Sequence, residues 1–109
     1  MTANRGTPVT MAPEIIKGHK NYTSKCDIYS IGIIMWQIIA RKEPYNLCSQ
    51  QDGIALIWNV AARDKRPPNL SCNIILSRFY ERCWHSDPDK RPTSEEVKEY
   101  FTILSKASV

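Results

Sequence analysis

The sequence predicts a mainly α-helical domain of about four helices, with no β-sheet. Apolar residues recur at helical spacing in several separate stretches, and no stretch alternates apolar and polar residues as a half-buried strand would. The chain has 109 residues, of which 42% are hydrophobic, so it is long enough for one modest core. The divisions expected are a loop over 1–22, a helical part over 23–105 and a short tail over 106–109.

The first segment and the first helix differ sharply in pattern. Glycines, prolines and an asparagine interrupt residues 1–22, which favours an extended loop. A long helix is expected to begin near Ser24, because Asp27 follows three residues later in a capping-box pattern with Asp in place of Glu. This helix is apolar on nearly every face, as buried helices are, and Pro44 ends its region. Gly32 costs it about 1 kcal/mol of helix propensity against Ala, so close packing is the expected reason for this glycine.

Three further helices are predicted from apolar residues three and four positions apart. They are expected over about 52–62, over about 73–84, and onward from an N-cap at Thr93 or Ser94. We interpret the tryptophans as packing residues. The apolar faces consist of Ile54, Ile57, Trp58 and Ala61 in the first of these helices, Leu76, Phe79, Tyr80 and Cys83 in the second, and Val97, Phe101 and Leu104 in the third.

Composition and charge argue against several classes of function. The net charge of +4 is spread along the chain, which indicates a solvated surface and no nucleic-acid partner. The four cysteines lack Cys-x-x-Cys spacing and paired histidines, so reduced thiols are expected and no metal site. No signal peptide is visible, and the longest apolar run, over 28–40, is interrupted and shorter than the roughly 20 residues that span a bilayer. We expect a cytoplasmic protein without a membrane partner.

Three short motifs occur in order along the chain. Residues 11–14 read Met-Ala-Pro-Glu, residues 27–32 read Asp-Ile-Tyr-Ser-Ile-Gly, and residues 83–93 read Cys-Trp-His-Ser-Asp-Pro-Asp-Lys-Arg-Pro-Thr. They resemble the Ala-Pro-Glu that closes the activation segment of protein kinases, the Asp-x-x-Ser-x-Gly that opens the central helix of the kinase C-terminal lobe, and the Cys-Trp-x-x-Asp-Pro-x-x-Arg-Pro-Thr of that lobe. This resemblance implies a part of the C-terminal lobe of the protein-kinase-like fold, without the sheet of the N-terminal lobe.

Within the kinases, the chain resembles the MAP kinase kinase kinases, and in particular the transforming-growth-factor-β-activated kinase family. Residues 1–6 read Met-Thr-Ala-Asn-Arg-Gly, similar to the run before Ala-Pro-Glu in that family, and Trp58 ahead of Arg-Pro-Pro at 66–68 also agrees. Residues 1–22 would then be what is left of the activation segment and its substrate-binding loop. The match implies a phosphorylation site at Thr2, with a residue of a disordered tail as the alternative.

The resemblance also assigns roles to charged residues. Glu14 and Arg91 would form a buried ion pair that fastens the activation segment to the helical lobe, and the planar guanidinium suits a carboxylate held by two parallel hydrogen bonds. The alternative is two unpaired surface charges. Asp27 would accept hydrogen bonds from the backbone of a His-Arg-Asp segment, which this chain lacks. A helix N-terminal acid favoured by the helix dipole is therefore the preferred interpretation of Asp27.

A substrate-binding shelf is implied for Thr7, Val9, Thr10 and Met11. Thr7 resembles the threonine that touches the catalytic aspartate, and Gly-Thr at 6–7 favours a Ser/Thr kinase over a tyrosine kinase. A simple turn residue is the alternative for Thr7. Kinases often have an aromatic residue at the position of Thr10, so the shape of the shelf departs from the family there.

The groups that handle phosphate in kinases have no counterpart in this sequence. It contains no Gly-x-Gly-x-x-Gly loop, no His-Arg-Asp and no Asp-Phe-Gly. We therefore expect no catalytic residue and no site for ATP or magnesium, the cofactors of the family, and we expect the chain to be an incomplete Ser/Thr kinase that is inactive by itself. An alternative is a non-catalytic binding module or decoy for kinase activators or substrates. A helical domain with chance similarity is a third, and three ordered motifs count against it.

The central helix poses a packing problem for a chain of this kind. In kinases it is also covered by the helix before the catalytic loop, which this sequence lacks, so part of the apolar surface over 28–39 should be exposed. At roughly 25 cal/mol per Å², a few hundred Å² left uncovered forfeits several kcal/mol, which is comparable with a domain's whole stability of about 5–15 kcal/mol. We expect marginal stability, self-association through this surface, or a required partner from a kinase cascade.

Overall fold

The computed structural model describes residues 10–18, 23–45, 50–70 and 74–107, and Thr2, Thr7 and Val9 lie outside these ranges. The described residues are mainly helical and contain no strand, as the sequence predicts. In the described ranges no helix is both long enough and apolar enough to cross a bilayer. The elements are α1 (Pro13–Ile16), α2 (Ser24–Ala40), α3 (Gln50–Arg63), α4 (Ile74–Cys83), the 3-10 turn η1 (Pro88–Lys90) and α5 (Ser94–Ala107).

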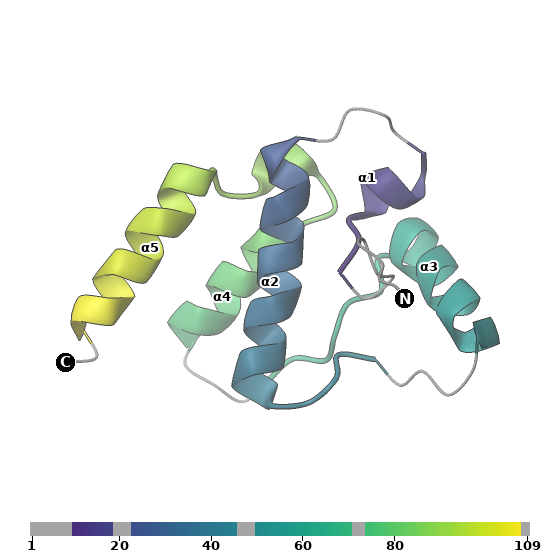
Figure 1. Cartoon of the computed structure of the whole chain (residues 1–109), viewed down its shortest axis with the longest axis horizontal. Coiled ribbons are helices and arrows are strands. Elements are labelled where there is room, and N and C mark those ends of the chain that lie inside the picture. The colour runs from purple at the N-terminus through teal and green to yellow at the C-terminus, as the bar shows by residue number, and fades with distance from the viewer. Residues whose placement is uncertain (1–9, 19–22, 46–49, 71–73, 108–109) are drawn as a thin grey trace.

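Helix α2 lies at the centre of the molecule. Figure 1 shows α4 and α5 on one side of it, and α1 and α3 on the other. The contacts agree with this view, because α2 packs against α4, α5 and η1, while α1 packs against α3. One buried cluster includes Tyr29, Ile33 and Trp36 of α2, and it continues into Tyr80 of α4. The indole nitrogen of Trp36 donates to the carbonyl oxygen of Pro68 at 2.7 Å, so its polar end is satisfied inside the core.

Helices α2 and α4 lie very close together at Gly32. A Cβ at this position would lie 2.8 Å from Cys83 Cβ and 2.9 Å from the carbonyl oxygen of Tyr80. A second cluster, formed by Ile28, Cys83 and Val97, lies nearby and joins α2, α4 and α5. The glycine is therefore needed for packing, which is the reason expected from the sequence.

Helices α5 and α2 both begin with a side-chain cap. In α5, Thr93 Oγ1 accepts from the amide of Glu96 at 3.1 Å, and Glu96 Oε1 accepts from the amide of Thr93 at 2.8 Å. This is a capping box. In α2 the N-cap is Thr23, whose hydroxyl accepts from the amide of Lys25 at 3.2 Å. The predicted cap at Ser24 is wrong by one residue, because Thr23 has the extended backbone of a cap and Ser24 is already helical.

The structure corrects two other predictions. The loop expected over 1–22 contains the one-turn helix α1, which begins at Pro13, a residue whose fixed φ suits the first helical position. In α3 the predicted apolar face is largely turned outward, since Ile54 is 69% and Trp58 55% exposed. Over 53–63, where the burial of α3 is described, the buried residues are Leu56 and Val60. This helix is apolar on both sides, and its neighbours cover only one of them. The interpretation of Trp58 as a packing residue is therefore wrong.

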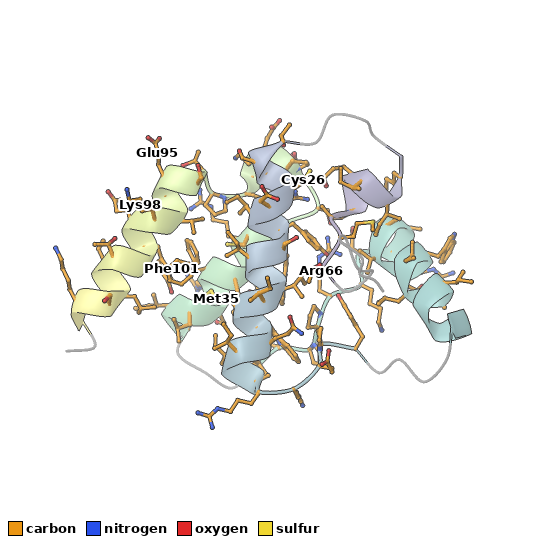
Figure 2. All side chains as sticks on the ribbon, in the orientation of Figure 1. Cys26, Met35, Arg66, Glu95, Lys98 and Phe101 are labelled. Carbon is orange, nitrogen blue, oxygen red and sulfur yellow. The ribbon has the colours of Figure 1, made fainter. Side chains whose placement is uncertain are left out.

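Part of the apolar surface of α2 is exposed, as the sequence predicts. Ile34 and Ile38 are among its exposed large apolar residues, and with Leu76, Phe101 and Leu104 they line an apolar groove of about 310 Å³ between α2, α4 and α5. Figure 2 shows Phe101 and Met35 on the helices that border this groove. Self-association through this surface stays a prediction.

Replacing Gly32 by Ala should destabilise the chain by about 1–2 kcal/mol, because overpacking of the α2–α4 contact outweighs the gain in helix propensity. Urea unfolding followed by circular dichroism measures the change. Gly53→Ala is the matched control, since Gly53 is also helical and a Cβ there would meet no atom within 4 Å. It should leave stability unchanged or raise it. Equal stabilisation by both variants would contradict the statement that α2 and α4 lie too close at Gly32 to accept a Cβ.

Candidate functional site

A buried ion pair joins the first turn of α1 to the residue that follows η1. Arg91 Nη1 donates to Glu14 Oε2 at 2.7 Å, and Arg91 Nη2 donates to Glu14 Oε1 at 2.8 Å. The side chain of Arg91 is fully buried and that of Glu14 is 11% exposed. The structure thus brings these two predicted residues together in the two-bond geometry that gives an arginine–carboxylate pair its strength and direction.

The other donors of Arg91 are also used. Its Nε donates to the carbonyl oxygen of His85 at 2.8 Å, and Nη1 donates to that of Lys25 at 2.9 Å. Lys25 returns a bond, because its Nζ donates to the carbonyl oxygen of Arg91 at 2.8 Å. The guanidinium therefore ties α1, the start of α2 and the turn after α4 to one point. We call this arrangement the Glu14–Arg91 clamp.

Burial and the charges of the clamp shift the pKa values of Glu14 and of two nearby thiols. Burial alone would raise the pKa of Glu14, but the hydrogen bonds and charge of Arg91 outweigh it and the pKa is lowered. Cys26 Sγ donates to Glu14 Oε2 at 3.3 Å, and burial followed by this carboxylate raises the pKa of Cys26. Burial raises the pKa of Cys83 to about 12. Both thiols stay protonated at neutral pH, so they act as small apolar groups and not as nucleophiles.

Two residues of the predicted shelf are described. The carbonyl oxygen of Thr10 accepts a hydrogen bond from Ser30 Oγ at 2.8 Å, which ties the chain before α1 to α2. Met11 is half-buried beside Ala12, whose side chain is in the core. Asp27 is exposed in the first turn of α2, where a negative charge favours the helix dipole.

Sequence reasoning missed the aromatic centre of this site. Tyr29 is buried, and the guanidinium carbons of Arg66 and Arg91 lie 5.1 and 5.2 Å from its ring centroid. Burial raises the pKa of Tyr29 and the two cations oppose the rise. Tyr29 belongs to the second motif, so its presence was visible, but no pattern in the sequence indicates that Arg66 would reach it.

The described residues hold no group of three or more His, Cys, Asp or Glu side chains that could bind a metal ion. What they do provide is a rigid junction between two distant segments and a fixed backbone at residue 10.

The comparisons with known proteins agree with the geometry. Residues 1–101 match the model of the protein kinase domain. The chain belongs to the protein kinase domain family. It is 58% identical over 104 residues to the mitogen-activated protein kinase kinase kinase mom-4 of Caenorhabditis briggsae, a match that covers 95% of this chain and 18% of the relative. The protein of the same name in Caenorhabditis elegans is 57% identical, over 95% of this chain and 19% of the relative.

More distant relatives carry a similar description. The human mitogen-activated protein kinase kinase kinase 7 is 35% identical over 104 residues, which are 95% of this chain and 17% of that protein. The resemblance to MAP kinase kinase kinases is therefore confirmed, and the helical architecture agrees with a part of the kinase C-terminal lobe. The chain spans about a fifth of the length of the curated relatives it matches.

Arg91→Met should destabilise the chain by about 3–5 kcal/mol, because it leaves the Glu14 carboxylate buried without its partner. Replacing both residues, as Glu14→Leu with Arg91→Met, should recover part of this loss, since no buried charge is then left. Urea unfolding of the single and double variants measures both effects. Arg82→Met is the control, because its ion pair with Glu96 is half-exposed and should contribute much less. A loss for Arg91→Met no larger than the control's would contradict the clamp.

The same pair should respond to acid. A lowered pKa in the folded state means that Glu14 stabilises the fold above the ordinary glutamate pKa of about 4.3, and that this contribution is lost as the pH falls through the lower, folded value. The stability difference between the wild type and Glu14→Gln should thus be full at neutral pH and shrink in acid. A difference that grows on acidification would contradict the assignment.

Proposed function

We propose that this chain is the substrate-side part of the catalytic domain of a cytoplasmic MAP kinase kinase kinase. The complete enzyme would transfer the γ-phosphate of ATP to a serine or threonine of a protein in a kinase cascade. One observation carries the proposal. The clamp joins the Glu of an Ala-Pro-Glu motif to the Arg of an Arg-Pro motif 77 residues later, inside a chain of the kinase family.

The geometry supports a positioning role for these residues. Because Glu14 is held on Arg91 and the carbonyl oxygen of Thr10 is held by Ser30, the segment over 10–14 has a fixed path against α2. A fixed segment can hold a substrate polypeptide at low entropic cost, and such positioning contributes much of the rate in phosphoryl transfer. Thr10 and Met11 would lie under the substrate backbone, with Thr7 and Val9 before them.

In the reaction, the substrate hydroxyl oxygen attacks the γ-phosphorus, the bond from that phosphorus to the bridging oxygen breaks, ADP leaves, and the hydroxyl proton passes to a base. The residues of this chain would orient the polypeptide that carries the hydroxyl. The groups that bind ATP and magnesium and accept the proton would come from other parts of a longer kinase, in keeping with relatives about five times as long.

The proposal predicts that the clamp is required for activity of the full-length kinase. Glu14→Gln and Arg91→Met should each lower transfer of labelled phosphate from ATP to a MAP kinase kinase by at least about tenfold, since misplacing a substrate segment costs more than about 1.4 kcal/mol. Arg82→Met should leave the transfer unchanged. The 109-residue chain alone should turn over no nucleotide. Full activity in Arg91→Met, or turnover by the chain alone, would overturn the proposal.

A second candidate function is protein docking without catalysis. The outward face of α3 favours it, because Ile54 and Trp58 are exposed and, with Ile16, Ile57 and Ala61, line a groove of about 410 Å³ beside α1. The guanidinium of Arg63 lies 4.8 Å from the Trp58 ring centroid and gives the face a basic edge. A chain with this face could compete with a complete kinase for a cascade protein.

If the chain acts as such a decoy, an excess of it should inhibit phosphorylation of a MAP kinase kinase by the full-length kinase. Trp58→Ser should abolish the inhibition, because truncating a large aromatic residue at a binding surface typically costs more than about 2 kcal/mol. Ile75→Ser is the control, since Ile75 is a comparably exposed apolar residue on α4, 63% accessible. Equal inhibition by both variants, or none by the wild type, would exclude docking through α3.

A further inference from the structure

One guanidinium, that of Arg66, fastens the linker after α3 to the end of α4. Its Nε donates to the carbonyl oxygen of Trp84 at 3.0 Å, and its Nη2 donates to Ser86 Oγ at 3.0 Å. Ser86 donates in turn to the carboxylate of Asp64 at 2.6 Å, which closes a ring of contacts. Asp64 has a φ of 55°, in the left-handed region that residues other than glycine seldom adopt, so these contacts fix a strained exit from α3.

Arg66 also reaches the clamp through the ring of Tyr29. Figure 2 shows its side chain in the space between α2 and α3. The guanidinium carbons of Arg66 and Arg91 lie at nearly equal distances, 5.1 and 5.2 Å, from the centroid of the same buried ring. Attraction between a cation and an aromatic face is strongest where water is excluded. The carboxylate of Glu14 and the carbonyl acceptors offset the repulsion between the two cations.

Both guanidiniums bind one short piece of backbone. Arg66 donates to the carbonyl oxygen of Trp84, and Arg91 donates to that of the next residue, His85. The place of this turn is therefore set jointly by the two arginines. Removing Arg66 would take away two hydrogen bonds from the turn and one cation from the Tyr29 ring, so both the ring and the turn that position Arg91 would be less constrained.

We infer that Arg66 is a positioning residue for the clamp. It contacts neither Glu14 nor the segment over 10–11 in any hydrogen bond of the described residues, and it acts through Tyr29 and the turn after α4 to keep Arg91 in place for Glu14. This inference rests on the proposed function for its catalytic consequence. Its structural part, that Arg66 controls the local stability of α1, stands on the contacts alone.

The experiment compares the full-length wild type with Arg66→Met, Arg66→Lys and Arg82→Met. Hydrogen exchange is measured at the amides of Ile16 and Lys17, which are bonded within α1, and at the amide of Val97 in α5. Arg66→Met should raise exchange in α1 by about fivefold or more while exchange at Val97 is unchanged. Arg66→Lys keeps the cation near Tyr29 and should restore part of the protection. Arg82→Met, which removes another arginine bridging two elements, should not affect α1.

Kinetics then test the catalytic consequence. Arg66→Met should raise KM for the protein substrate about fivefold with KM for ATP unchanged, because a loosened clamp moves only the polypeptide-binding segment. Equal loss of protection in α1 and α5 would show that Arg66 stabilises the whole fold and would overturn the inference. Wild-type protection of α1 in Arg66→Met would overturn it as well. A wild-type protein that transfers no phosphate would overturn the proposed function instead, and the exchange data would still decide the role of Arg66.

Discussion

The fully buried guanidinium of Arg91 is the constraint on which the rest of the structure depends. A charge without access to water is tolerated only when a counter-charge and further acceptors surround it. Glu14 supplies the counter-charge from 77 residues away, and backbone carbonyls of Lys25 and His85 complete the set. These acceptors come from three parts of the chain, so Arg91 is satisfied only when all three have assembled. The pair therefore favours the arrangement in which α1, the start of α2 and the turn after α4 meet, whatever its net contribution to stability.

Around this point the molecule divides into two halves that α2 separates. On the side of α4 and α5 the contacts are close, as the approach at Gly32 shows, yet Ile34 and Ile38 are left exposed in an apolar groove. On the side of α1 and α3 the exposed apolar surface lies on Trp58 and its neighbours. Burial of such surface is the main favourable term in folding and association. Two uncovered apolar surfaces therefore lie on opposite sides of one central helix.

The sequence allowed α2, α4 and α5 to be predicted because each has a long apolar period and a recognisable start or stop. It did not allow α1 to be predicted, since the four residues over 13–16 are too few to carry a period. Periodicity identified the apolar residues of α3, but it did not show which side of the helix packs against the rest of the protein. Trp58 was therefore interpreted as a packing residue. In the site, Glu14 and Arg91 could be paired from motifs. Arg66 could not, because its position over Tyr29 depends on the path of the linker, which no local pattern encodes.

Helix α3 has two routes to the clamp, and they end on opposite partners of the ion pair. Its main helix contact is α1, which carries Glu14. Its exit is the linker with Arg66, which is bonded to the turn that accepts from Arg91. A protein that bound the exposed face of α3 and displaced this helix would therefore shift the Glu14 carboxylate through α1. It would shift the Arg91 guanidinium through the linker with Arg66. Because the two hydrogen bonds between Glu14 and Arg91 are directional, opposed shifts would weaken the pair while a common shift would preserve it. Docking at α3 would thus be coupled to order in the segment over 10–14, through the packing of α3 on α1 and through the linker with Arg66.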